Sequence, residues 1–359
     1  LPVIYVNGIK INSQDELAAL LPKNIENIEV DYLAIGEGAT TKGGVIRITT
    51  KKQKDGGYSG SLGLKAGAMA AYGYNSSSPT FVFDASIGKW TFNYYAVNQH
   101  QKLIEDAKYN YLYDSGLQTN SISETRSWLN SFGNRLNISY EVNDKSTLAI
   151  SEYVGNVTIK NKQNSVVETI LGNDEEAMES NNMIHGPESQ FVQQTVAKYI
   201  LTTDDKGSKL EVTADYYHQN HHLKQFEDID NIRTYENSTQ EKTNMFQLYP
   251  KYTRKFNGGK ELKVGANYQF IRYNDETDGL SNDADAHIAS AYANFTGMTK
   301  SLMYSAGLTL QYNRMDVQTA QETTFFDDVY LCPQANLMWM INPQKGRMLG
   351  VMYQCSVSD

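Results

Sequence analysis

The sequence predicts an all-β membrane protein: an antiparallel transmembrane β-barrel preceded by a small α/β segment. Three observations predict this class. From Tyr58 onward, apolar and polar residues alternate over segments of about ten. Polar turns containing glycine or asparagine separate these segments. Tyrosine is also abundant, with 25 residues against 12 phenylalanines and 3 tryptophans. Such a chain suits strands whose two faces meet different surroundings.

The composition excludes several other classes. With 40% hydrophobic and 20% charged residues, the 359-residue chain resembles neither a disordered chain nor a helical membrane protein. No apolar run is long enough for a transmembrane helix. A net charge of −9 argues against nucleic acid as a partner. No signal-peptide pattern opens the chain at Leu1, so we expect any signal peptide to be cleaved or to lie outside this sequence.

The first 55 residues follow a different pattern. Val3–Val6 predicts a short buried strand. A helix is expected from Ser13, because Glu16 can complete a capping box, and Pro22 ends it. Alternation over residues 25–30 and the run over residues 43–49 predict two more strands. We therefore divide the chain into a small mixed unit, residues 1–55, and a barrel segment, residues 56–359.

The barrel strands are clearest where the alternation is strict. Over residues 262–270 and 302–313, every second residue is apolar. Residues 147–157 are less regular, because Glu152 falls among the apolar residues. In a wide barrel the lumen is wet or plugged, so the apolar face points to lipid. The residues expected to point outward are Leu262, Val264, Ala266, Tyr268, Phe270, Leu302, Tyr304, Leu308, Leu310 and Tyr312.

The connections between strands also favour a barrel. Tight turns are expected near residues 88–89, 143–146, 204–208, 257–260, 298–301 and 343–346. Between them lie polar stretches at about residues 102–130, 159–189, 220–243, 274–285 and 316–328, which we interpret as long loops. Short periplasmic turns and long outer loops are typical of outer-membrane barrels. A soluble β-sandwich is the alternative, but the polar faces carry Asn, Gln, Ser, Thr and Gly far more than Lys and Glu.

The N-terminal motifs resemble a known family. The runs PVIYVNGIKI and IENIEVDYLAIGEGATTKGGVIRITTKK are similar to the second half of the plug domain of TonB-dependent outer-membrane receptors. Asn7 stands where that family has aspartate, and residues 31–41 depart from its usual RGPxAxxYG stretch. These departures resemble the Bacteroidetes branch of outer-membrane β-barrels. No TonB box and no first plug half are visible, and the resemblance covers the barrel only by architecture.

The strand count predicts a partial barrel. We count about thirteen strands from Tyr58, whereas plugged transporters of this architecture have about 22, so roughly nine should be missing. If the short turns are periplasmic, strand thirteen ends outside, near Asp359. Both edge strands would then be unpaired, which is untenable in lipid for an isolated chain.

Candidate site residues are few. Tyr109, Tyr111 and Tyr113, with Trp128 at the far end of the same expected loop, are the best candidates for ligand contact. Self-packing of the loop is the alternative. In the plug, the expected hairpin glycines are Gly36, Gly38, Gly43 and Gly44. Gly43 and Gly44 supply permissive backbone angles before a strand. No helix follows them, so they do not form a phosphate loop.

The sequence offers no catalytic, metal or cofactor site. His100, His218 and His287 lie near strand ends without a nucleophile or acid at a useful spacing, so we expect no enzyme. The acidic stretches at residues 227–230 and 282–285 could offer oxygen ligands to calcium but lack EF-hand spacing, and solvated loop charge is the alternative. Alternation places Cys332 on the polar face and Cys355 on the apolar face, so no disulfide is expected between them.

Two function hypotheses remain open. The resemblance implies an outer-membrane receptor or transporter of a Gram-negative bacterium, taking up a glycan, peptide or metal chelate. It further implies a plug moved by a periplasmic TonB-type energy-coupling protein, membrane lipid around the barrel, and a possible surface lipoprotein partner. The alternative is a non-transporting barrel that binds a surface partner or mediates adhesion. The cargo cannot be read from the residues.

Overall fold

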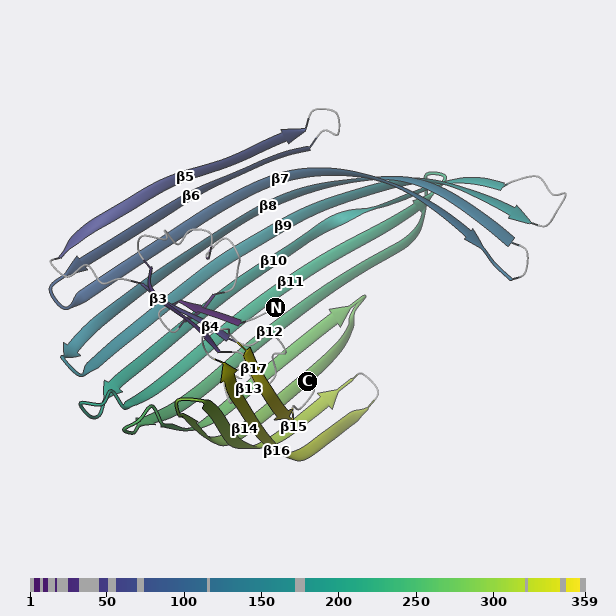
Figure 1. The fold of residues 1–359 in the computed structure, drawn as a ribbon. Helices are drawn as coiled ribbons and strands as arrows, with labels where there is room; N and C mark the ends of the chain where they lie inside the picture. The colour runs from purple at the N-terminus through teal and green to yellow at the C-terminus, as the bar shows by residue number, and fades with distance from the viewer. Residues whose placement is uncertain are drawn as a thin grey trace.

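The protein is described by a computed structural model. It describes residues 3–6, 9–11, 17, 25–31, 45–50, 56–69, 74–114, 117–171, 178–319, 322–342 and 347–355. These residues are almost entirely β-strand, and they form two separate sheets (Figure 1). None of the described helical structure is long and apolar enough to cross a bilayer.

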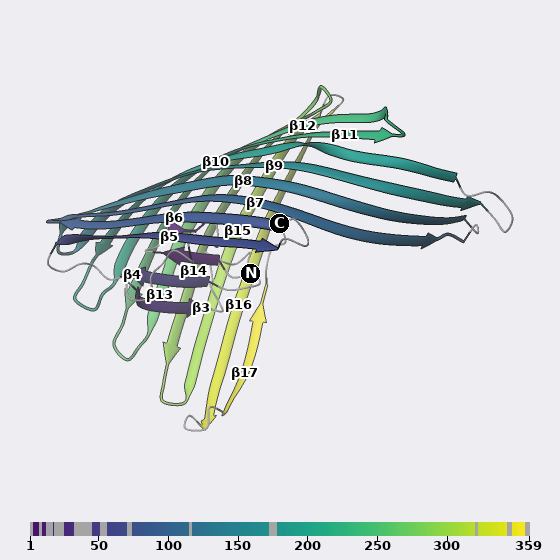
Figure 2. The same cartoon turned by 90° about the horizontal axis from the view of Figure 1, so that it is seen from above.

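The large sheet contains thirteen strands, which confirms the predicted number. Each strand pairs antiparallel with its neighbours in sequence, from β5 at one edge to β17 at the other. The strands are β5 (Gly57–Met69), β6 (Tyr74–Ile87), β7 (Trp90–Leu112), β8 (Leu117–Asn143), β9 (Ser146–Leu171), β10 (Met178–Thr202), β11 (Lys209–Ile229), β12 (Ile232–Lys255), β13 (Glu261–Thr277), β14 (Leu280–Met298), β15 (Leu302–Gln318), β16 (Thr323–Asn342) and β17 (Arg347–Gln354). The sheet curls strongly, so that β13–β17 turn back beneath β5–β8 (Figures 1 and 2).

Five of the six predicted tight turns lie where the sequence predicts them, and the sixth, at residues 343–346, lies outside the described residues. The expected long loops do not exist as loops. Turns at residues 88–89, 144–145, 203–208, 256–260 and 299–301 define what we call the short-turn end of the sheet. Gly258 and Gly259 have φ of 76° and 71°, which glycine adopts without strain. At the opposite end, most residues of the polar stretches continue the strands. The prediction of long loops at residues 102–130, 159–189, 220–243, 274–285 and 316–328 is therefore wrong.

Two-residue turns explain this error for residues 220–243 and 274–285. Asp230 and Asn231 have φ of 49° and 67°, and Asp278 and Gly279 have φ of 50° and 79°. Positive φ at both central residues defines the tight hairpin turn that matches the twist of paired strands. The polar residues on either side therefore remain in register across the hairpin instead of looping out.

The two faces of the large sheet differ as predicted. All ten residues expected to point to lipid share one face, because cross-strand partners such as Ala266 and Ala291 lie on the same side. On that face Leu310 is 50% exposed, whereas its neighbour Thr309 is 6% exposed. Leu331 and Cys332 show the same contrast, with 61% and 5%. The apolar face is therefore the outer, convex face, and the prediction is confirmed. A sandwich would bury it.

The concave face is lined by polar side chains that bond to one another. Buried Arg135 donates to the Ser151 hydroxyl at 3.1 Å, and Gln194 donates to the Asp215 carboxylate at 2.8 Å. Glu211 accepts from two lysines: its oxygens lie 3.1 Å from Lys198 Nζ and 3.0 Å from Lys251 Nζ. Because buried polar groups without partners are costly, these bonds allow polar side chains to line the concave face.

Glu152 lies on the convex face, as its place in the alternation predicts. Two neighbours on β10 satisfy its carboxylate: Gln193 donates at 2.8 Å and Thr195 at 2.5 Å. The pairing keeps both carboxylate oxygens bonded at a position where lipid would offer no donor.

The small sheet contains four strands in the order β2-β1-β4-β3. These are β1 (Val3–Val6), β2 (Ile9–Lys10), β3 (Ile25–Asp31) and β4 (Val45–Thr50), and β1 and β4 run parallel. Val45 and Ile48 of β4 are buried. The sheet lies on the concave side of the large sheet (Figures 1 and 2). The expected helix from Ser13 lies outside the described residues apart from Leu17.

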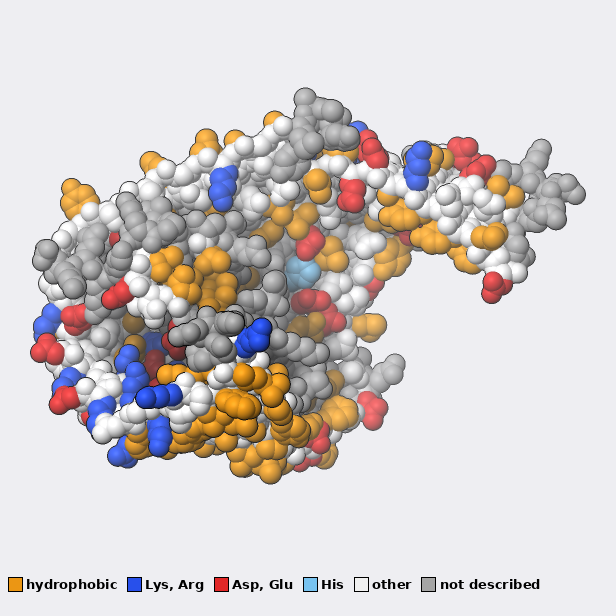
Figure 3. Space-filling model, viewed as in Figure 1, with side chains coloured by type: hydrophobic (Ala, Val, Ile, Leu, Met, Phe, Trp, Pro, Cys, Tyr) orange, Lys and Arg blue, Asp and Glu red, His pale blue; other side chains and the backbone are white. Residues whose placement is uncertain are grey.

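Hydrophobic and charged side chains gather at different parts of the surface. Hydrophobic side chains cover the curled β13–β17 region, whereas acidic and basic side chains gather near the short-turn end (Figure 3). The long extensions of β7–β10 carry charges of both signs (Figure 3). This distribution follows the lengths of the strands, because only the middle of each long strand can lie within lipid.

The two cysteines lie closer together than predicted. The Cys332 and Cys355 sulfurs are 3.1 Å apart and both thiols are free. The register of β16 with β17 is as expected, since Leu337 pairs with Val351. However, β17 ends at Gln354, so strand alternation no longer fixes the direction of the Cys355 side chain. The prediction that Cys355 points outward, away from Cys332, is therefore wrong.

This contact predicts ready oxidation. Treating the folded full-length protein with a mild disulfide-forming oxidant should link Cys332 to Cys355, because two thiols in contact need little backbone movement to reach bonding geometry. Peptide mapping under non-reducing conditions would detect the linked peptide, and Cys332→Ser is the control. Recovery of both cysteines as separately alkylated peptides after oxidation would contradict the contact.

The lysine–glutamate network predicts a large loss of stability on truncation. Glu211→Ala leaves two lysines facing each other on the inner wall, and breaking such a buried pair costs about 3 kcal/mol. The free energy of unfolding in detergent, followed by tryptophan fluorescence, measures the loss. The matched control is Asp205→Ala, since Asp205 pairs with Lys145 at 3.5 Å but its side chain is 99% exposed. Equal effects of the two substitutions would refute a structural role for the network.

Candidate functional site

The extended end of the large sheet is the first candidate site. Strands β7–β12 have 21 to 27 residues, whereas β13 and β15 have 17. A transmembrane strand needs only about 9–11 residues to cross the hydrocarbon. The remaining residues of β7–β10 project beyond the rest of the sheet (Figure 1). This extension can meet molecules in the surrounding medium.

The candidate aromatic residues occupy the tip of the β7–β8 hairpin. Tyr109 and Tyr111 lie near the end of β7, with ring centroids 6.2 Å apart and planes within 12° of parallel. Tyr113 follows the strand, and the three side chains are about half exposed. Alternate residues of one strand hold these rings side by side. The rings form an exposed apolar surface that a planar or sugar-like ligand can contact.

Trp128 does not join this group. Trp128 lies directly opposite Lys102 of β7, whereas Tyr109 lies opposite Ser121. Trp128 is therefore seven residues along β8 from the partner of Tyr109. Because Trp128 pairs with an even-numbered residue of β7, it lies on the convex face, while the odd-numbered tyrosines lie on the other face. The expectation of one loop carrying all four aromatics fails because residues 117–130 are part of strand β8.

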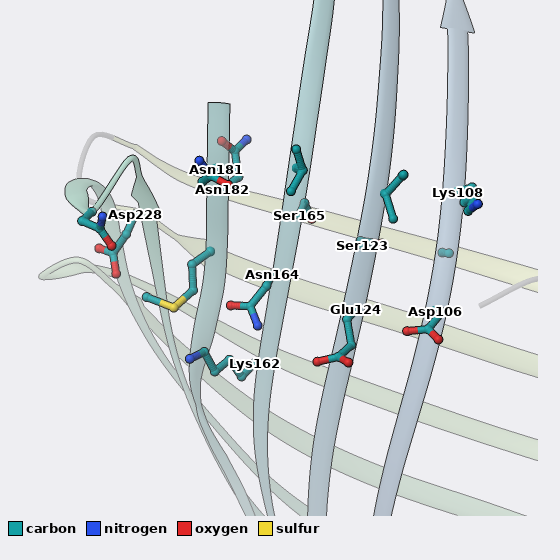
Figure 4. A pocket seen from close by; sticks show the side chains of 15 residues that line it. Asp106, Lys108, Ser123, Glu124, Lys162, Asn164, Ser165, Asn181, Asn182 and Asp228 are labelled. Atoms are coloured by element: carbon teal, nitrogen blue, oxygen red, sulfur yellow. The ribbon is translucent and has the colours of Figure 1, made fainter. Parts of the chain in front are cut away.

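A hollow of about 980 Å³ lies on the extension of β7–β11 (Figure 4). Polar side chains from five strands or their turns line it, among them Asp106, Glu124, Lys162, Asn164 and Asp228. Asp106, Glu124 and Asn164 lie side by side in register on β7, β8 and β9, and Lys162 is two residues from Asn164 on β9. The hollow therefore offers both carboxylates and a lysine to a polar ligand.

An ion-pair cluster closes one side of this hollow. Asp228 accepts a hydrogen bond from Arg233 Nε and lies 3.2 Å from His185 Nε2. The Arg233 guanidinium stacks 4.4 Å from the centroid of Phe226. The hydrogen bond from Arg233 holds the pKa of the Asp228 carboxyl below its usual value, and the His185 contact adds to this. The cluster fixes the tip of the β11–β12 hairpin against β10.

The concave face holds a second polar cluster that the sequence did not single out. His221 lies between two carboxylates, with Nε2 at 3.1 Å from Glu188 and Nδ1 at 3.3 Å from Glu241. A neutral imidazole has one N–H, so it can donate to only one of the two carboxylates. His221 and its neighbour His222 point to opposite faces, because both lie within β11 rather than in a loop. Recognising residues 217–226 as a strand would have revealed this.

The other residues considered in the sequence occupy simpler places. The three histidines expected near strand ends lie inside β7, β11 and β14, because these strands extend through the expected loops. Each contacts one polar side chain: His100 faces Asn130, His218 faces Asn244 and His287 faces Tyr268. In the acidic stretches, Arg272 pairs with Asp285 at 2.9 Å. Within the described part of the chain, no three histidine, cysteine or acidic side chains are placed to hold a metal ion. Gly36, Gly38, Gly43 and Gly44 lie outside the described residues.

Comparison with known proteins supports the membrane architecture. Residues 201–358, somewhat less than half of the chain, match the outer membrane protein beta-barrel family. With the apolar convex face and the antiparallel sheet, this match identifies an all-β outer-membrane protein of barrel architecture from a Gram-negative bacterium. A comparison with curated protein sequences gave no match.

Several solved structures are similar in arrangement. The ferric citrate transporter FecA in the unliganded form is 11% identical, with a TM-score of 0.39, covering 98% of this chain and 70% of that chain. The ferric yersiniabactin uptake receptor FyuA from Yersinia pestis is 8% identical, with a TM-score of 0.35 and coverages of 98% and 80%. The ferric-catecholate import receptor Fiu from E. coli K12, in its open form, is 9% identical, with a TM-score of 0.37 and coverages of 95% and 76%.

The ion-pair cluster predicts how the hairpin tip responds to charge removal. Asp228→Asn should loosen the β11–β12 tip and speed trypsin cleavage at Arg233 severalfold, because the amide no longer attracts the guanidinium or the imidazole. The rate of cleavage in the folded full-length protein measures this. Asp230→Asn is the matched control, since the amide oxygen can still accept the bond that the Asn181 amide donates to Asp230. Unchanged cleavage in the Asp228 variant would show that the cluster does not hold the tip.

Proposed function

We propose that this chain is part of an outer-membrane receptor that takes up an extracellular nutrient. The observation that carries the proposal is the small β1–β4 sheet on the concave, polar side of a curved wall with an apolar convex side. An object filling a wide polar lumen blocks free passage, so transport requires that it move. The resemblance of residues 1–55 to half of a plug domain supports the same assignment, with residues 56–359 as the barrel segment.

In this proposal a periplasmic TonB-type protein supplies the energy that moves the plug. The extended end faces the outside, because the short turns belong to the periplasmic side of such barrels. The cargo class stays open among glycans, peptides and metal chelates. Tyr109, Tyr111 and Tyr113 would make the first contact, and the Glu188–His221–Glu241 cluster lies on the face that the cargo passes. A surface lipoprotein could cover the extension, and we assign no catalytic role.

Uptake by cells tests the proposal. Cells carrying or lacking the full-length gene are given a labelled oligosaccharide, a labelled short peptide and a ferric chelate, with and without a protonophore. We expect one cargo to accumulate only in cells that have the gene and only without the protonophore, because plug movement needs energy coupling. If none of the three accumulates in a gene-dependent and energy-dependent way, the transport proposal fails.

The tyrosine pair gives a residue-level test in the same cells. Tyr109→Ala with Tyr111→Ala should lower cargo binding at least about threefold, since one aromatic contact contributes about 0.5–1.5 kcal/mol. The control replaces Tyr58 and Tyr353, which are 81% and 59% exposed on the two edge strands, away from the extension. Equal losses in both variants would remove the tyrosines from the binding site.

The alternative is a surface-binding or adhesion protein that does not transport. The length of the β7–β12 extension favours it, because an exposed, stacked pair of tyrosines far from the membrane suits contact with a large partner. Binding of a cargo or cell surface that depends on the gene, persists with the protonophore and leads to no accumulation would support this alternative.

A further inference from the structure

Six of the 11 methionines of the chain lie together on one face of β14–β17, near the short-turn end of the sheet. Met298 of β14 is the direct ladder partner of Met303 on β15, and Met303 is the direct partner of Met338 on β16. Met340 is two residues beyond Met338 and lies opposite Met348 on β17. We call the whole group the methionine patch: Met298, Met303, Met338, Met340, Met348 and Met352.

The methionine patch lies on the concave face. Met338 and Met340 share a face with Cys332, because all three have even numbers on β16, and that face is the concave one. Their direct partners lie on the same face, and so does Met352, which lies opposite Asn336. Four of the six side chains are between 40% and 60% exposed, and Met338 and Met340 are half-buried. The thioethers are therefore open to the space inside the curved sheet.

Among the described residues of these strand segments, sulfur is confined to the inner face. The outward positions carry apolar side chains without sulfur: Leu302, Leu337, Trp339, Leu349 and Val351. The inner positions between the methionines carry no leucine, isoleucine, valine or phenylalanine, and they are Thr296, Ser305, Asn336 and Gly350. A surface that served only apolar packing would use the same residue types on both faces, so the inner face indicates a requirement for thioether sulfur.

Neighbouring thioethers of the patch can reach one ion. Direct partners have Cβ atoms about 4.5–5.5 Å apart, and residues two apart on one strand are separated by about 6.6 Å. The methionine side chain has three rotatable bonds, so the sulfurs of Met303, Met338 and Met340 can turn towards a common point. Gly350 lies opposite Met338 and has no side chain that could cover this point from β17.

The chemistry of the thioethers selects the class of ion. Thioether and thiolate sulfur are soft ligands that favour Cu(I), whereas zinc takes imidazole, thiolate or carboxylate and calcium takes oxygen. The patch itself contains neither a carboxylate nor an imidazole. On the neighbouring part of the concave face, Glu261 and Lys263 pair with each other at 3.2 Å. The patch therefore suits a soft monovalent cation and lacks the ligands that a divalent cation needs.

We infer that the methionine patch binds Cu(I) through its thioether sulfurs. Met303, Met338 and Met340 form the centre of the site, since each has other patch methionines on two sides. The thiol pair of Cys332 and Cys355 is a separate feature, because Cys332 lies six residues from Met338 along β16, about 20 Å away. The inference concerns metal binding at the inner wall and is independent of the proposed uptake of a nutrient.

Cu(I) binding by the purified full-length protein tests the inference. Cu(I) is supplied with ascorbate in the absence of oxygen, and competition with a coloured Cu(I) chelator measures the affinity. The patch variant replaces all six methionines with leucine, a change that nearly conserves volume. We expect it to bind Cu(I) at least about tenfold more weakly than the wild type, since even the loss of a residue that supports a ligand lowers metal affinity about 10–100-fold.

Two further variants serve as controls and should bind Cu(I) as the wild type does. The first replaces the five methionines outside the patch with leucine: Met69, Met178, Met183, Met245 and Met315. The second combines Cys332→Ser with Cys355→Ser and leaves the patch intact.

The other outcomes overturn the inference. Wild-type affinity in the patch variant would remove the thioethers from the site, and an equal loss in the first control would reduce the effect to methionine content. Loss of binding in the double serine variant would assign Cu(I) to the cysteines. Displacement of Cu(I) by an equal concentration of Zn(II) would show that the site does not select soft ions.

Should the patch variant fail to fold, methionine oxidation in the wild type decides. Hydrogen peroxide converts exposed thioethers to sulfoxides, and a bound soft ion occupies the sulfur lone pair that reacts. With Ag(I) as a redox-inert substitute for Cu(I), peptide mapping should show severalfold slower oxidation of Met303, Met338 and Met340. Met178, which is 66% exposed on the extension, should oxidise at an unchanged rate. Unchanged rates at the three patch residues, or equal protection of Met178, would refute binding by the patch.

Discussion

Backbone hydrogen bonding within the bilayer is the constraint on which the rest of the structure depends. Lipid offers no partner to a peptide N–H or C=O, so a chain crossing it as strands must pair each strand with its neighbours. The antiparallel ladder meets this requirement for β6 to β16, whereas the edge strands β5 and β17 are each paired on one side only among the described residues. Once the ladder is in place, side chains must alternate between its two faces, and the positions of all the sites described above follow from that alternation.

The concave face shows what this alternation places inside. Side chains that would be exposed on a soluble sheet here face one another across a curved wall, and they bond to one another, as Glu211 does with its two lysines. The same rule places the Glu188–His221–Glu241 cluster on the inner wall. A polar wall of this kind suits contact with water, and the small sheet lies on the same side of the large sheet.

The convex face changes character along each strand. Near the short-turn end its residues are mainly apolar, as around Leu310 and Leu331, and Glu152 is tolerated because Gln193 and Thr195 bond to it. Twelve residues farther on, the same face carries Lys102 and Lys160 beside Trp128. The same face of β7–β9 therefore changes from mainly apolar to polar and charged along the strands.

The sequence by itself determined the class of fold, the number of strands and the face that meets lipid. These follow from a period of two, which is local and survives any arrangement of the strands. It also located the tight turns that contain glycine, such as Gly258-Gly259. The polar residues at 102–130 and 220–243 led to a wrong prediction of loops. Polar side chains indicate contact with water, and a strand can also be in contact with water. The two-residue turn Asp230-Asn231 distinguishes a hairpin of two long strands from a long loop.

Tertiary structure alone decided which residues meet. Trp128 joins lysines from β7 and β9 instead of the tyrosines near it in sequence, because cross-strand register, and not distance along the chain, sets its neighbours. His221 meets carboxylates 33 and 20 residues away for the same reason. Cys355 lies against Cys332 because the strand ends one residue before it, and where a strand ends depends on pairing with its neighbour. Periodicity fixes the face of a residue, but only the paired strands fix its partners.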